Sequence, residues 1–279
     1  MSGESVINMV AGGVYALLLL AGTVVSVALW VRLRTSPGRW TVRAGRLIRR
    51  PISAEDSFFV IALLICTVLV ASTLQPTMGL DPYGVGPHDV IILSVALHWS
   101  TLLVLTVLLR LRGLAWKRVF GTGLFRLGGD LWRGLIAYLA MLPVVFVCSV
   151  AYRFVLQFAG MELEIQDVAR ILTDDVPPLI HVYLLFVAVV LGPIAEELLF
   201  RGMLFPILAR RIGVMESLWV VSVLFGAVHV HLPSFLPLCM VSIAFCMAYV
   251  YSGSIAVPIA MHALFNGVNL MLYPMLRGE

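Results

Sequence analysis

The run INMVAGGVYALLLLAGTVVSVALWV, residues 7–31, decides the fold class of this chain. It contains no charged side chain and is longer than the roughly 20 apolar residues that an α-helix needs to cross a bilayer. It is also too long for the core of a signal peptide, has no basic segment before it and is followed by no AxA-type cleavage site. We therefore interpret this run as a retained membrane-spanning helix.

The composition and seven further apolar runs extend this interpretation to the whole chain. Of the 279 residues, 61% are hydrophobic and 12% are charged, whereas a soluble domain has about 45–50% and about 25%. An ordinary soluble domain, a disordered chain and a disulfide scaffold are thereby excluded. The sequence predicts an all-α, polytopic membrane helix bundle of about eight transmembrane helices. They are expected at residues 7–31, 57–75, 89–109, 134–158, 180–205, 214–231, 234–251 and 254–273.

The charges between the apolar runs predict the orientation of the chain in the membrane. Lys and Arg gather in segments 32–50 and 110–133 and again at residues 210–211, whereas loop 76–88 has none and loop 159–179 is acidic. The positive-inside rule then places the first, third and fifth loops in the cytoplasm and both termini outside. We attribute the net charge of +4 to this orientation and not to a nucleic acid partner. The prediction is an integral, multi-pass protein of the cell (plasma) membrane, with the lipid bilayer as a partner.

The chain divides into two parts by where its ionisable residues fall. Residues 1–175 are expected to form N-terminal transmembrane helices with basic cytoplasmic loops and no motif. Segment 32–50 is predicted to be one such loop, because Pro37 and Gly38 interrupt its amphipathic pattern. Residues 176–279 hold most of the ionisable side chains inside apolar runs, where each costs about 2.5–3.5 kcal/mol to insert. We therefore expect a functional site among the last four helices.

Residues 192–201, GPIAEELLFR, carry the decisive acidic pair. Glu197 and Arg201 are four residues apart on one helical face, with the acid first, so they are expected to neutralise one another. Glu196 lies about 100° around the helix from Glu197 and cannot share that face. It is left as an uncompensated carboxylate, which suits a general base acting on water. Pro193 frees a backbone carbonyl and predicts a kink just before the two glutamates.

Two more helices offer partners for this carboxylate. His262 and Asn266 are also four residues apart, and two hydrogen-bond donors on one rigid face suit a developing oxyanion. Phe225 lies one turn before His229, so its ring is expected to wall the imidazole and fix its rotamer. His229 is then expected to orient water beside Glu196 or to donate a proton to a leaving group.

Other interpretations of these residues stay open. Glu196, His229 and His262 would be the ligands if a metal is bound, but without an HExxH motif no cofactor is favoured and zinc stays an alternative. A proton-coupled transporter or a non-catalytic membrane scaffold would use the same groups as a relay, although the two halves show no inverted repeat. His98 is isolated, and we interpret it as structural, with an accessory role at a polar cavity as the alternative. His231 is interpreted as interfacial.

The expected topology conflicts with this site at one point. Helix five is expected to enter from outside near residue 180, which places Glu196 in its cytoplasmic third. His229 falls near the outer end of helix six. The two side chains can meet only if helix five bends at Pro193 or the expected boundaries of helix six are wrong.

Together the three motifs resemble those of the CAAX-protease and bacteriocin-processing (CPBP, also called Abi) family of intramembrane peptidases, and its type II CAAX prenyl endopeptidases in particular. The family pattern is a double Glu with Arg four residues after the second, then Phe-xxx-His, then His-xxx-Asn or His-xxx-Asp, on successive helices. The resemblance covers about residues 180–273. The matching positions are Glu196-Glu197-xxx-Arg201, Phe225-xxx-His229 and His262-xxx-Asn266.

The resemblance implies an α-helical membrane endopeptidase with a conical cavity open to water. It gives Glu196 and His229 the role of activating water and places His262 and Asn266 at the oxyanion. The other motif residues, Glu197, Arg201 and Phe225, are then supporting residues of the site. It favours glutamate-based hydrolysis over a metalloprotease. The implied substrate is a membrane-associated protein or peptide, and a lipid-modified one is an option that the family does not fix. The sequence predicts no oligomeric state.

Overall fold

The computed structural model describes residues 3–35, 39–74, 87–161 and 177–277, and all regular structure within them is helical. The prediction of an all-α membrane helix bundle is therefore confirmed. Three short stretches, η2, η4 and η5, are π-helical turns inside longer helices, and η3 is a 3-10 turn. The elements are α1 (Gly3–Arg34), α2 (Arg39–Ile48), α3 (Ala54–Leu74), α4 (Pro87–Ser94), η2 (Val95–Trp99), α5 (Ser100–Leu111), α6 (Trp116–Phe120), η3 (Leu124–Arg126), α7 (Leu127–Phe158), α9 (Pro178–Phe186), η4 (Val187–Leu191), α10 (Gly192–Glu197), η5 (Leu198–Leu204), α11 (Phe205–Ile212), α12 (Val214–Ala227), α13 (Leu232–Ser252) and α14 (Ala256–Arg277).

Six of the eight predicted spans are long and apolar enough to cross a membrane in the described part of the chain. They are Met9–Arg34, Ala54–Thr73, His88–Leu111, Leu127–Phe158, Pro178–Ile212 and Leu232–Ser252. The other two predicted spans are shorter apolar helices, Val214–Ala227 and Ala256–Leu272. The chain is thus an integral, multi-pass membrane protein.

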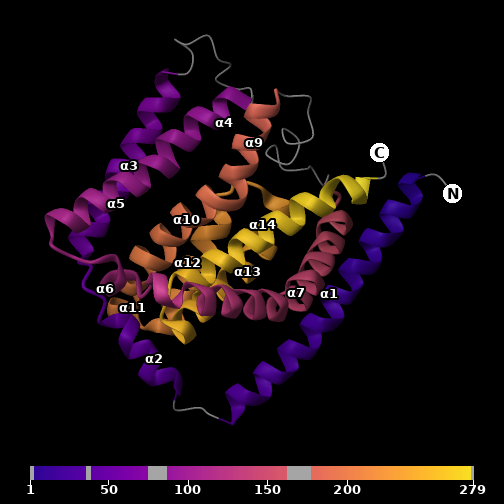
Figure 1. Cartoon of the computed structure of the whole chain (residues 1–279), viewed down its shortest axis with the longest axis horizontal. Helices are drawn as coiled ribbons and strands as arrows, with labels where there is room; N and C mark the ends of the chain where they lie inside the picture. Colours follow the sequence, from indigo (N-terminus) through magenta and orange to yellow (C-terminus); the bar gives the residue numbers. More distant parts are fainter. Residues whose placement is uncertain (1–2, 36–38, 75–86, 162–176, 278–279) are drawn as a thin grey trace.

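The helices differ in how much of their surface other helices cover. Other parts of the protein bury only 6% of the apolar stretch of α1, whereas they bury 44% of the apolar stretch of α13. The side chains that α1 leaves exposed are large and apolar, as a lipid-facing surface requires. Figure 1 shows α13 among α7, α12 and α14 near the middle of the molecule, with α1 beside α7 at one flank and α3 with α5 at the other. The inner position of α13 and its neighbours is where a site can be shielded from lipid.

The stretch from Pro178 to Ile212 is one long helix interrupted only by π-helical turns. Gly213 then reverses the chain into α12 with a φ of +94°, a backbone conformation that favours glycine. Glu196 lies 16 residues before Ile212 along one arm of this hairpin, and His229 lies 15 residues after Val214 along the other. The two residues therefore stand at the same depth.

This geometry resolves the conflict in the expected topology. The long helix runs to Ile212 and not to 205, so Glu196 lies near its middle. The helix expected at 214–231 ends at Ala227. It is about 21 Å long and does not span the roughly 30 Å hydrocarbon core. The expected boundaries of helix six were wrong, and the correction brings His229 to Glu196.

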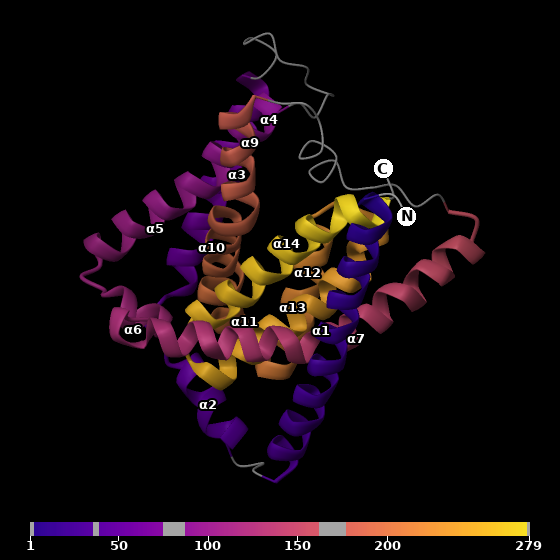
Figure 2. The ribbon, with the colours of Figure 1, turned by 45° about the vertical axis from the view of Figure 1, so that its right-hand side comes forward.

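A second correction concerns the first basic segment. Arg39–Ile48 forms helix α2 and not a loop. Its buried residues Ala44 and Leu47 belong to the main hydrophobic core, and α2 packs against α11 and α13. Pro37 and Gly38, taken as an interruption, precede the helix. The two predicted outer loops fall largely on residues 75–86 and 162–176, outside the described residues. Figure 2 shows α2 at the opposite end of the molecule from α4.

Candidate active site

The long helix places Glu197 in the interior, where its side chain is fully buried. Its Oε1 accepts a hydrogen bond from Nη1 of Arg201 at 2.8 Å, one helical turn further on. The same oxygen lies 2.9 Å from Nδ1 of His262 on α14. Because a carboxylate only accepts hydrogen bonds, the proton of the His262 Nδ1 atom points at Glu197. Glu197 is thus committed to an ion pair and to the orientation of one histidine.

Arg201 is also fully buried, and side chains from three helices surround its guanidinium. Its Nη2 donates to Oγ of Ser242 on α13 at 2.6 Å. Its Cζ lies 4.5 Å from the centre of the Phe225 ring and 5.1 Å from that of Phe245. A charge inside a membrane is stable only with such partners. The guanidinium therefore ties η5, α12 and α13 together beneath the two glutamates.

His229 follows the end of α12, and its imidazole is held from two sides. Its Nδ1 lies 2.7 Å from the backbone oxygen of Phe225, a carbonyl that can only accept, so Nδ1 carries the proton. The ring of Phe225 packs against it with centroids 4.9 Å apart and lies 5.7 Å from the ring of His262. Phe225 is therefore wedged between the two imidazoles. Since each histidine donates from Nδ1, each presents the lone pair of Nε2 when neutral.

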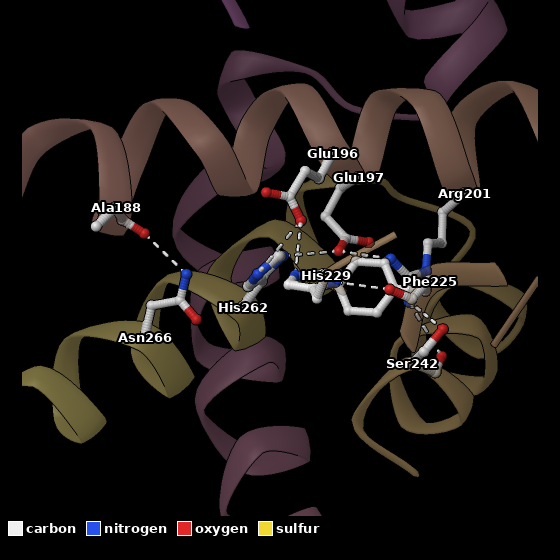
Figure 3. Close-up of polar contacts among 9 residues, drawn as sticks. All are labelled: Ala188, Glu196, Glu197, Arg201, Phe225, His229, Ser242, His262 and Asn266. Carbon is white, nitrogen blue, oxygen red and sulfur yellow. Dashed lines mark hydrogen bonds and ion pairs between the residues drawn. The ribbon is translucent and has the colours of Figure 1, made fainter. Parts of the chain in front are cut away.

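The carboxylate of Glu196 is where the two histidines converge (Figure 3). Its Oε2 lies 4.0 Å from Nε2 of His229 and 4.0 Å from Nε2 of His262. Among the described residues this oxygen has no hydrogen-bond partner, although it is shielded from solvent. Unlike Glu197, Glu196 has no cation bound to it here, and about a quarter of its side chain is exposed. The arrangement leaves one carboxylate free for chemistry beside two oriented imidazoles.

Residues 178–268 match the family model described as type II CAAX prenyl endopeptidase Rce1-like. The matched segment is about a third of the chain and includes every residue of the three motifs. The predicted resemblance to CAAX proteases is thereby confirmed. No curated protein and no solved structure matches the chain.

The family match supports a CAAX-type intramembrane peptidase in general, and hence a protease-type hydrolase. Together with the apolar helices it points to a bilayer and a peptide substrate as partners.

Asn266 lies apart from the other motif residues. Figure 3 shows its side chain turned away from Glu196 toward the long helix. Its Nδ2 donates to the backbone oxygen of Ala188 at 2.8 Å. Ala188 lies five residues before Pro193, and the neighbouring N–H of Gly192 bonds to Val187 in this five-residue, π-helical register. Because proline has no N–H, the Ala188 carbonyl lacks that partner within the helix, and Asn266 supplies one. The carbonyl expected to be freed by Pro193 is therefore bonded to a motif residue.

The alternative that Glu196, His229 and His262 bind a metal ion depends on the distances between their side chains. Within the described ranges no group of three or more His, Cys, Asp or Glu side chains stands close enough to hold a metal ion. Two ligand atoms that bind one zinc ion tetrahedrally at about 2.0–2.1 Å lie about 3.3–3.4 Å apart, whereas Oε2 of Glu196 lies 4.0 Å from each imidazole Nε2.

Two contacts of the site were missed in the sequence. Ser242, which binds Arg201, is separated from it by 41 residues, and a lone serine in an apolar helix carries no signal of its partner. The Ala188 carbonyl could have been found from the position of Pro193 only if the π-helical register had been known.

His231, interpreted as interfacial, precedes α13, where its Nδ1 lies 2.8 Å from Oγ of Ser234.

Proposed function

We propose that this chain is an intramembrane endopeptidase that hydrolyses a peptide bond of a membrane-associated protein or peptide, with Glu196 as the general base. The observation that carries the proposal is Oε2 of Glu196, unpartnered among the described residues and 4.0 Å from both imidazole Nε2 atoms. A water molecule within hydrogen-bond distance of the carboxylate and an imidazole fits such a gap, which no direct hydrogen bond spans.

The reaction follows from the proton positions. Glu196 removes one proton from the water, and the lone pair of His229 Nε2 accepts the hydrogen bond from its other proton. The hydroxide attacks the carbonyl carbon of the substrate, which forms a tetrahedral oxyanion. When the C–N bond breaks, the carboxylic acid of Glu196 returns its proton to the leaving amine. General acid–base catalysis of this kind contributes about 10²–10⁴-fold to the rate.

His262 is proposed to stabilise the oxyanion, the role that the sequence predicted for it together with Asn266. Since the Nδ1 proton of His262 points at Glu197, Nε2 can donate only when the ring is an imidazolium. The carboxylate of Glu197, 2.9 Å away, is the counter-charge for that state. The amide of Asn266 donates to Ala188 and is turned away from Glu196, so it supports the long helix.

Substitution of the proposed base tests the function. Purified protein in liposomes is given a fluorogenic peptide ending in a CAAX sequence, once prenylated and once not. Glu196→Gln is expected to reduce cleavage at least about 100-fold, whereas Glu216→Gln, which removes an exposed carboxylate from the first turn of α12, leaves it unchanged. Retained cleavage in the Glu196 variant contradicts the assignment. We propose that the prenylated peptide is the better substrate, because its lipid partitions to the depth of the site.

The zinc-dependent alternative makes the opposite prediction for chelators. The glutamate-based reaction is expected to continue at full rate after dialysis against a chelator. Loss of cleavage that zinc restores would assign the reaction to a metalloprotease. Proton-coupled uptake into the same liposomes without cleavage would favour the transporter. A plasma-membrane location is also proposed, and membrane fractionation tests it.

A further inference from the structure

His98 stands beside the Glu196 carboxylate although it belongs to the N-terminal part of the chain, outside the matched segment. It lies in η2, the π-helical turn between α4 and α5, and η2 packs against α10. A methyl group added at Gly192 would lie 3.6 Å from Oε1 of Glu196 and 3.7 Å from Nε2 of His98. Both atoms therefore border the same small space over a residue that has no side chain.

The protonation of His98 follows from its surroundings. Its Nδ1 is buried and has no hydrogen-bond partner among the described residues. A neutral imidazole carries one N–H, and a buried N–H without an acceptor is costly. The proton is therefore better placed on Nε2, which faces the side of Glu196. This gives His98 an N–H donor at the space over Gly192 that Oε1 of Glu196 also borders.

The π-helical turn is fastened to the helix that carries Glu196. The hydroxyl of Tyr183 on α9 shares a hydrogen bond of 2.8 Å with Oγ of Ser94, and it accepts a bond of 3.3 Å from Nε1 of Trp99. These two contacts lie on either side of His98 in sequence. Since α9 and α10 are parts of one long helix, both contacts tie the turn that carries His98 to the helix that carries Glu196.

We propose that His98 is a positioning residue for Glu196. Its Nε2–H bonds to Oε1 through one water molecule in the space over Gly192, and so holds the carboxylate with Oε2 toward His229 and His262. Two histidines then border one oxygen of Glu196 and a third borders the other. The proposal rests on the proposed function, in which Oε2 receives the proton from water.

The test compares two substitutions of His98 with a control on the preceding helix. His98→Phe keeps a ring but has no donor, and is expected to lower kcat about 10-fold or more with KM unchanged within about twofold, since orientation acts in the transition state. His98→Gln places an amide Nε2 near the original Nε2 and is expected to keep kcat within about threefold. His88→Gln, an exposed histidine of α4, is expected to behave as the wild type. Equal kcat in the Phe and Gln variants, whether both high or both low, would overturn the proposal.

An infrared measurement tests the interaction of His98 with the Glu196 carboxylate without relying on peptide cleavage. The carboxylate band of Glu196 is identified as the band that the Glu196→Gln variant lacks. His98→Phe is expected to shift this band, and His98→Gln to leave it close to its wild-type position. If the protein cleaves no peptide, the proposed function fails while the infrared result still decides on His98. An unshifted band in the Phe variant would show that the imidazole does not reach the carboxylate.

Discussion

The two adjacent glutamates differ in what surrounds them, and this difference can be measured. Oε2 lacks a hydrogen-bond partner in both glutamates within the described part of the chain. Glu197 is fully buried and shares its Oε1 between Arg201 and His262, whereas the imidazole nitrogens beside Glu196 lie 4.0 Å from it. Removing one partner of a buried ion pair costs about 3–5 kcal/mol, because it leaves the other charge uncompensated. We expect Glu197→Gln to lower the free energy of unfolding by about that amount and Glu196→Gln to leave it nearly unchanged.

Unfolding by sodium dodecyl sulfate in mixed micelles, followed by circular dichroism, gives both values. Glu216→Gln is the control for the loss of a carboxylate. Equal stability of the two variants would mean that Arg201 does not depend on Glu197 for its charge partner.

At the same scale, the sequence predicted some contacts of single residues and not others. The pairing of Glu197 with Arg201 follows from a spacing of four residues within one helix. The contact of Glu197 with His262 spans 65 residues, and the space over Gly192 that His98 and Glu196 both border lies between helices that no motif links. Spacing within a helix fixes which side chains share a face, but the packing of helices decides what that face meets.

Among the elements, the long helix depends on a hydrogen bond from α14. Asn266 donates to the Ala188 carbonyl, whose partner in the π-helical register would be the N–H that Pro193 lacks. We expect Asn266→Ala to cost about 0.6–2 kcal/mol of stability, the range for such bonds in membranes. In a Pro193→Ala background residue 193 regains an N–H, so the same substitution is expected to cost less.

A double-mutant cycle in the same micelles measures this coupling, which is expected to reach about 0.5 kcal/mol or more. Asn269→Ala, an exposed asparagine on the same helix, is the control for loss of an amide. Additive effects of the two substitutions would contradict the shared carbonyl.

The elements that the sequence did not predict are those whose conformation depends on packing against other helices. Helix α12 ends at Ala227 although the apolar run continues, and π-helical turns flank α10 although nothing in the periodicity marks them. Segment 39–48 is helical because Ala44 and Leu47 have a core to pack against. The apolar runs predicted the long helices correctly, since a run of about 20 apolar residues in a bilayer has few alternatives to a helix.

For the whole molecule, the placement of the basic helix α2 and of α4 at opposite ends gives the topology a direct test (Figure 2). The positive-inside rule places α2 at the cytoplasmic face and the loop before α4 outside. We expect Val42→Cys, at a position that is 68% exposed on α2, to react with a membrane-impermeant maleimide only in inverted vesicles. His88→Cys on α4 is expected to react only in intact cells. Cys66 and Cys148 are replaced by alanine in both variants, because they are the two cysteines that are not buried. Labelling of both positions from one side would require a different path of the chain through the membrane, and with it a different face from which peptides reach Glu196.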